Sequence, residues 1–150
     1  MKLKIDYLKY KRNLKIKSDS GQNLVWDRIR KKYIVPTPEE MVRQLFVEYL
    51  IEELQYSPIK IGIERKILVN DMVKRFDIFV VDKLVKPYML VECKAPEVPL
   101  TNEVFEQVSL YNQTIRVPYI VITNGIETYC AHLNYEKNSY SFLEKIPEPA

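Results

Sequence analysis

The segment from residue 88 to residue 123 constrains the fold more than any other part of the chain. Tyr88 to Lys94 has the character of a strand, a helix is expected from near Thr101 to near Thr114, and residues 119–123 (Tyr-Ile-Val-Ile-Thr) are expected to form a fully buried strand. A helix between two strands allows a right-handed crossover that makes them parallel. The sequence therefore predicts a sheet that contains a parallel pair and is covered by helices.

The segments on either side extend this sheet. Thr37-Pro38-Glu39-Glu40 is a strong helix start, and the apolar spacing after it predicts a helix to about residue 55. Strands are expected at Ile59 to Leu68, at Arg75 to Val81 and at residues 126–132, the last core strand. The order α-β-β-β-α-β-β, with an antiparallel meander before the crossover, predicts an α/β domain with a mixed central sheet flanked by α-helices.

Charge divides the chain into two parts. Residues 1–32 carry a net charge of +8, whereas the remaining 118 residues carry −5. We therefore expect one domain at 36–150, with residues 1–35 as a basic N-terminal extension packed on it. A basic arm on an acidic body suits a protein that holds phosphates with one part and cations with another. A solvated, lysine-rich terminus explains the same charge pattern equally well.

Several classes of protein are disfavoured by what the chain contains. No apolar run approaches the length that spans a bilayer, and the first residues have no signal-peptide core, so we expect a cytoplasmic protein with no membrane partner. Cys93 and Cys130 lie in strand-like runs and are expected to be buried, reduced thiols. His132 is the one histidine, which argues against a histidine-rich metal site and a Ser/His/Asp triad.

The residues best placed for chemistry are Asp77, Glu92 and Lys94. Because side chains alternate along a strand, Glu92 and Lys94 point to the same face, and Asp77 on the neighbouring strand can face them. Two carboxylates form an oxygen site that suits Mg²⁺, with Lys94 placed to stabilise developing charge. The alternative is an ion pair of Glu92 with Lys94 at the sheet rim, and a turn-facing Asp77.

This spacing resembles a known family. Asp77 followed by Glu92-Cys93-Lys94 is similar to the signature of PD-(D/E)xK nucleases, and Gln107 with Tyr111 matches the Gln-x-x-x-Tyr motif of one branch of them. The resemblance is greatest to the N-terminal nuclease domain of type I restriction enzyme R (HsdR-like) subunits, over roughly residues 27–132. It includes Thr37-Pro38-Glu39-Glu40, Val42-Arg43-Gln44 and Val121-Ile122-Thr123-Asn124-Gly125.

The resemblance implies a Mg²⁺-dependent endonuclease fold, in which Mn²⁺ can substitute. It implies that Gln107 and Tyr111 lie beside the catalytic centre and contact DNA, and that Glu40 is the first-helix glutamate of the site. Each has a structural alternative: Tyr111 as a packed aromatic and Glu40 as a capping-box residue. Two features depart from the family. Phe76 stands where the family has a proline before Asp77, and R subunits continue into a large ATP-driven translocase, whereas this sequence has 150 residues.

A basic and aromatic cluster offers a second candidate contact with DNA. Arg28, Arg30, Lys31 and Lys32 lie close in sequence to aromatic residues, a combination that suits phosphate and base contacts, although a solvated charge run is an equal alternative. Glu64, in contrast, is expected to be a solvated acid on an exposed strand.

The sequence leaves three functions in competition. The first is metal-dependent hydrolysis of DNA, in association with restriction-modification or translocase subunits. The second is a non-catalytic nuclease-fold module that binds nucleic acid or docks onto a restriction complex. The third is an interaction domain whose acids form an ion-pair network. The chain has no Gly-x-x-x-x-Gly-Lys loop and no basic reading helix, so we expect no ATP site, and weak, poorly sequence-specific cleavage by the chain alone.

Overall fold

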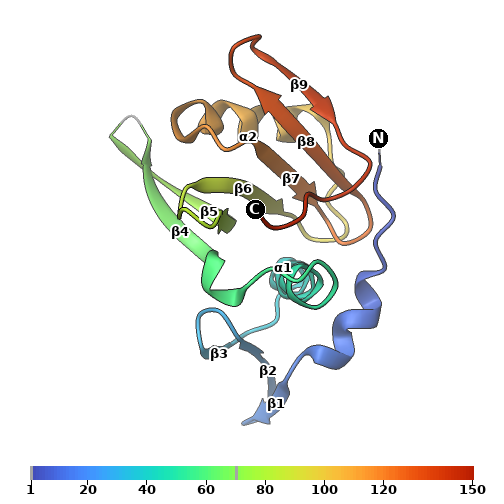
Figure 1. Ribbon diagram of the computed structural model, residues 1–150. Coiled ribbons are helices and arrows are strands. Elements are labelled where there is room, and N and C mark those ends of the chain that lie inside the picture. The colour runs from blue at the N-terminus through green and yellow to red at the C-terminus, as the bar shows by residue number, and fades with distance from the viewer. Residues whose placement is uncertain (1, 70) are drawn as a thin grey trace.

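The computed structural model describes residues 2–69 and 71–150, without the side chains of Ile67, Val69, Tyr111 and Thr114. Its centre is a six-stranded sheet in the order β4-β5-β6-β7-β8-β9 (Figure 1). The strands of this sheet are β4 (Ile61–Val69), β5 (Met72–Val81), β6 (Pro87–Cys93), β7 (Tyr119–Thr123), β8 (Thr128–Asn134) and β9 (Ser139–Phe142).

The remaining elements are two α-helices, three short helical turns and a small sheet. They are α1 (Pro38–Glu48) and α2 (Asn102–Ile115), the 3-10 turns η1 (Tyr7–Asn13) and η3 (Pro58–Lys60), the π-helical turn η2 (Tyr49–Glu53), and the antiparallel sheet of β1 (Ile16–Asp19), β2 (Gln22–Asp27) and β3 (Lys32–Ile34).

The central sheet is mixed, as the sequence predicts. Neighbouring strands are antiparallel except for β6 and β7, which run parallel and are joined by α2. The two ladders that matter for the site are those of β5 with β6, where Ile78 pairs with Val91, and of β6 with β7, where Glu92 pairs with Ile122. The last core strand expected at residues 126–132 is β8, and one further strand, the fully exposed β9, pairs with it.

Both α-helices begin at the residues that the sequence indicates. The Thr37 side chain accepts a hydrogen bond from the Glu40 backbone N–H, and the Thr101 side chain caps α2 in the same way. The first helix is regular only to Glu48 and then widens into η2, so it does not continue as an α-helix to residue 55. The buried face of α2 includes Phe105 and Val108.

Each α-helix covers one face of the central sheet. Ile78, Val80 and Val91 belong to the core on the α1 side, whereas Leu90 and Ile120 belong to the core on the α2 side. Figure 1 shows α1 lying between the central sheet and the small sheet β1–β3. The site residues, where the ladder between β5 and β6 stops, therefore lie in a sheet that is covered on both faces.

The basic N-terminal segment contributes to the main core. Tyr7 and Tyr10 are almost fully buried, and their rings pack against Phe46 and Tyr49. After η1 the segment continues into the strands β1, β2 and β3 of the small sheet. Removing the first residues would expose this core, so DNA contacts in the segment are better tested by point substitution than by truncation.

The C-terminal residues cross back over the sheet from β9. Ile146 is buried, the Tyr56 hydroxyl donates to the Pro147 carbonyl at 2.6 Å, and the Lys83 N–H donates to the Ala150 carbonyl at 2.8 Å. These contacts fasten the end of the chain beside the loop between β5 and β6. Within the described residues no helix has the length and apolarity needed to cross a membrane.

Candidate active site

Asp77 lies where β5 and β6 stop pairing. The antiparallel ladder runs as far as Ile78 opposite Val91, and the next main-chain donor of β6, the Cys93 N–H, is taken by the Asp77 carboxylate. The distance from Cys93 N to Asp77 Oδ2 is 2.8 Å. A side chain therefore replaces the main-chain partner, which fixes the Asp77 carboxylate beside the backbone of Glu92 and Cys93.

Glu92 and Lys94 lie side by side, with Lys94 Nζ 3.4 Å from Glu92 Oε1. Burial and the negative charge of Asp77 together raise the pKa of Glu92 to about 7, against the opposing charge of Lys94. A carboxyl hydrogen bond between Asp77 and Glu92 acts in the same direction. The three residues thus influence one another directly, as an acidic pair with one adjacent cation.

A cleft of about 220 Å³ opens beside Glu92 and Lys94. Its other wall comes from α2, through Val104, Gln107 and Val108, so Gln107 lies in the same cleft as Glu92. The remaining lining residues are Lys74, Arg75 and Phe76 of β5. The side chain of Tyr111 lies outside the described part of the structure, and its role stays a prediction.

Arg43 of α1 reaches Asp77 from the opposite side of the sheet. Its guanidinium lies 3.3 Å from Asp77 Oδ1 and 3.0 Å from Glu64 Oε1, and its side chain is almost completely buried. The Nε and Nη1 atoms of Arg43 lie outside hydrogen-bond geometry, so the contacts act mainly through charge. The expectation that Glu64 is a solvated acid is wrong, because two arginines contact its carboxylate and hold its pKa below the usual value.

A second arginine connects this group to the N-terminal sheet. Arg30 donates to Glu40 at 2.8 Å, to Glu64 at 3.1 Å and to the fully buried Asp27. Gln44 also donates to Asp27 and Glu40. Although burial alone would raise it, the hydrogen bonds and charge of Arg30 hold the pKa of Asp27 below its usual value. Glu40 is therefore a member of a buried ion network, one arginine away from Asp77.

The network determines which basic residues of the N-terminal segment can reach a ligand. Arg30 turns its side chain inward onto carboxylates, and Arg28 pairs with Glu48 and Glu52. Neither arrangement favours the DNA contact that the sequence predicts for these two arginines. Lys31, in the turn before β3, and Lys32, its first residue, are exposed and remain placed for such a contact.

Sequence reasoning selects Glu40 and misses its neighbour Glu39. Burial and the negative charge of Asp77 raise the pKa of Glu39, against the charges of Arg43 and Lys94. Glu39 therefore responds to the same charges as Glu92, whereas the Glu40 carboxylate is engaged by Arg30. The adjacent acids of the helix start contain no local signal that separates the two.

The donor set at this site fits one divalent cation of the magnesium type. In the described residues no group of three or more His, Cys, Asp and Glu side chains is gathered for a metal, so the candidate ligands are the pair Asp77 and Glu92. Mg²⁺ commonly binds through one or two carboxylates and retains several waters. The pKa of Glu92, raised in part by Asp77, shows two acids whose mutual repulsion a cation would relieve.

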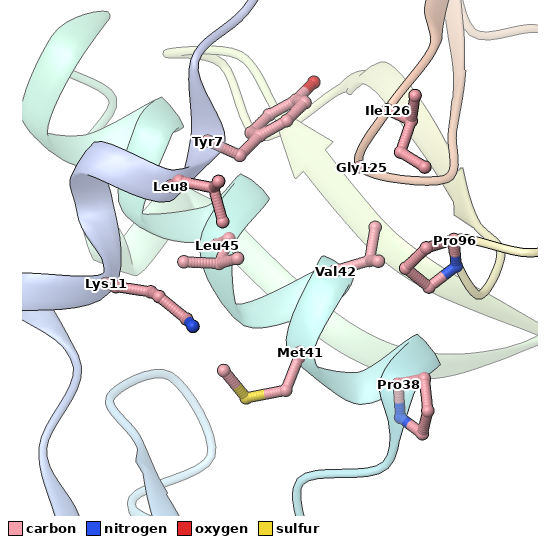
Figure 2. A pocket seen from close by; sticks show the side chains of 10 residues that line it. All are labelled: Tyr7, Leu8, Lys11, Pro38, Met41, Val42, Leu45, Pro96, Gly125 and Ile126. Atoms are coloured by element: carbon pink, nitrogen blue, oxygen red, sulfur yellow. The ribbon is translucent and has the colours of Figure 1, made fainter.

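A separate cavity of about 340 Å³ lies near the start of α1 (Figure 2). Figure 2 shows its lining side chains coming from η1, α1, the loop after β6 and the turn between β7 and β8. Lys11 is the one charged residue among those that line it, and none is a carboxylate. The cavity therefore has no group that resembles the acidic pair.

The mixed sheet with a helix on each face, and with acids on two neighbouring strands where the ladder between them stops, defines a restriction-endonuclease-like α/β fold. The chain belongs to the family described as type I restriction enzyme R protein N terminus (HSDR_N), whose pattern matches residues 38–147. The resemblance inferred from Asp77, Glu92 and Lys94 is thus confirmed at the level of the family.

A solved structure supports the same fold. It is a fragment of a putative HsdR subunit of a type I restriction enzyme from Vibrio vulnificus YJ016, with a TM-score of 0.52 and 18% sequence identity. The match covers 74% of this chain and 24% of that chain, so this chain spans about a quarter of that solved protein. No curated protein matches the sequence.

Proposed function

We propose that the protein is a Mg²⁺-dependent endonuclease that hydrolyses DNA phosphodiester bonds. The observation that carries the proposal is the position of Glu92 and Lys94 in the wall of one cleft, with the Asp77 carboxylate of the neighbouring strand held on the Cys93 N–H between them. Asp77 and Glu92 would hold the cation, which Mn²⁺ can replace. The cation would supply Lewis-acid stabilisation of charge on the phosphate.

The chain's own side chains have separable roles in this proposal. Lys94 lies beside Glu92 and can neutralise charge that develops on a phosphate in the cleft. The Cys93 N–H orients the Asp77 carboxylate, and Gln107 offers an amide on the wall of the cleft that α2 supplies. The family context supports DNA as the substrate and the other subunits of a restriction complex as partners.

A second candidate function is a non-catalytic module that binds nucleic acid or docks onto such a complex. One observation favours it: both acids already have cationic partners, Asp77 through Arg43 and Glu92 through Lys94. The open cleft favours catalysis instead, because a purely structural ion network requires no accessible space beside the acids. Cleavage assays separate the two candidates.

The test of the proposal is nicking of supercoiled plasmid with Mg²⁺ or Mn²⁺, with EDTA as the blank. We expect open-circular product with either cation and none with EDTA. Asp77→Asn should lower the rate of nicking by at least about a hundredfold, since it removes one negative charge from the cation site. Equal, cation-independent nicking by the wild type and the variant would show that the activity arises elsewhere.

The exposed lysines of the N-terminal segment give a further prediction. Lys31→Ala combined with Lys32→Ala should weaken duplex binding and lower the slope of log affinity against log salt by about two, since each lost phosphate contact removes about one unit. Titration by fluorescence anisotropy at several salt concentrations measures both quantities. An unchanged slope would identify these lysines as ordinary solvated surface.

A further inference from the structure

The β4–β5 hairpin extends past the rest of the sheet (Figure 1) and carries a basic surface that the catalytic proposal does not use. Arg65 and Lys66 of β4 and Arg75 of β5 are exposed, and Lys74 precedes Arg75 on β5. Asp71 is the one acid between Arg65 and Phe76. This part of the hairpin is therefore strongly cationic, although the body of the chain is acidic overall.

Two of these cations face each other across the ladder. The register of the hairpin pairs Lys66 directly with Arg75. Like charges in directly opposed positions destabilise a sheet, and an anion placed between them would remove the repulsion. The pairing is therefore unfavourable for the isolated fold and suits a polyanionic ligand.

Two positions further toward the end of the hairpin, and so on the same face, lies an exposed apolar pair. Leu68 pairs with Val73, and their exposed fractions are 68% and 62%. Met72 adds a third exposed apolar side chain at 58%. Exposed apolar groups beside a row of cations match a DNA groove, where phosphates flank base edges and thymine methyl groups.

The hairpin is continuous with the candidate active site. The cleft that contains Glu92 and Lys94 is lined on one side by Lys74, Arg75 and Phe76 of β5. Phosphates bound along the hairpin would therefore lead into the space beside the acidic pair. A two-stranded ribbon is also one of the elements that the major groove admits.

We propose that the β4–β5 hairpin is a DNA-binding arm that lies in the major groove, with Lys66 and Arg75 on flanking phosphates and Leu68 and Val73 toward the bases. The proposal deepens the proposed function, because it assigns the surface that would guide DNA to that site. The binding it describes does not require that the DNA be cut.

The experiment measures binding of a short fluorescein-labelled duplex by anisotropy, with Ca²⁺ replacing Mg²⁺. Lys66→Ala combined with Arg75→Ala should weaken binding on the order of tenfold and lower the salt slope by about two. Methyl green, a major-groove ligand, should displace the protein, whereas the minor-groove ligand netropsin should not. The matched control, Lys83→Ala with Lys137→Ala, removes the same charge from exposed positions elsewhere and should bind as the wild type does.

A second variant guards against loss of folding. Lys66→Glu places opposite charges across the ladder, which should preserve or raise the melting temperature while binding falls. Unchanged affinity and salt slope in both hairpin variants, displacement by netropsin alone, or absence of duplex binding by the wild type would each overturn the proposal. Binding that depends on the hairpin, without cleavage, would support the DNA-binding arm and count against the nuclease function. Cleavage with unaltered binding by the hairpin variants would support the nuclease function and count against the arm.

Discussion

Replacing Glu92 by glutamine is expected to lower the rate of DNA cleavage by about a thousandfold or more. The substitution keeps the shape of the side chain but removes one of the two charges that would hold the cation. The measurements are plasmid nicking and calorimetric titration with Mn²⁺, whose binding should be lost in parallel. Glu97→Gln, at an exposed position in the loop after β6, is the matched control and should behave as the wild type.

The same substitution is expected to stabilise the metal-free fold at high pH. The pKa of Glu92 is raised above its usual value to about 7, so folding disfavours its ionised form. The free-energy cost of ionising Glu92 in the folded protein is absent when the pH is below its pKa in the unfolded chain. The cost grows as the pH rises and is complete above its pKa in the folded protein. In EDTA the variant should therefore exceed the wild type on the order of 2 kcal/mol at pH 8 and match it near pH 4. Loss of both activity and stability at pH 8 would instead indicate a structural role.

Replacing Arg43 by methionine is expected to destabilise the fold by about 3–5 kcal/mol. The almost fully buried guanidinium lies between the carboxylates of Glu64 and Asp77, and it also approaches Glu40. Its removal leaves these acids with less compensating charge inside the protein. Urea unfolding at constant slope measures the loss, and a midpoint shift worth less than about 1 kcal/mol would mean that solvent already screens the acids.

Two further variants make the Arg43 result specific. Lys9→Met removes a cation from the exposed Lys9–Glu53 pair and should change stability by no more than about 0.5 kcal/mol. Arg43→Met combined with Asp77→Asn should lose less than the two single variants together, because the neutral amide no longer requires a buried counter-charge. Simple additivity would show that Arg43 and Asp77 do not interact energetically.

The fold could be predicted where its signals are local. Thr37 and Thr101 mark the starts of the two helices, because each side chain caps the helix that follows it. The helix between the strands ending at residue 94 and beginning at residue 119 allows the crossover that makes those strands parallel. The strand β9 is not among the predicted strands, although Ser139-Tyr140-Ser141-Phe142 alternates polar and aromatic residues as a strand does. Its signal is weak because the strand has only four residues, and all four are exposed.

The candidate site divides along the same line. Glu92 and Lys94 lie together because of strand alternation, which a sequence displays directly. The contacts of Arg43 with Glu64 and Asp77, and of Arg30 with Glu64, join residues far apart in the chain and depend on how α1 packs against the sheet. Side-chain direction at that interface also decides between Glu39 and Glu40, and periodicity alone does not contain that information.

The fastening of the C-terminal residues has a practical consequence for surface measurements. Ala150 is held by Lys83, in the loop that precedes β6, whereas the acidic pair lies where β6 ends. A biotin or surface tether attached after Ala150 would therefore leave the protein from the opposite end of the strand. Molecules immobilised in this way would have the anchor at one end of β6 and the cleft at the other. A tether at the N-terminus would instead attach to the segment that contains Tyr7 and Tyr10, which belong to the core. Force applied there would act directly on the packing of the core.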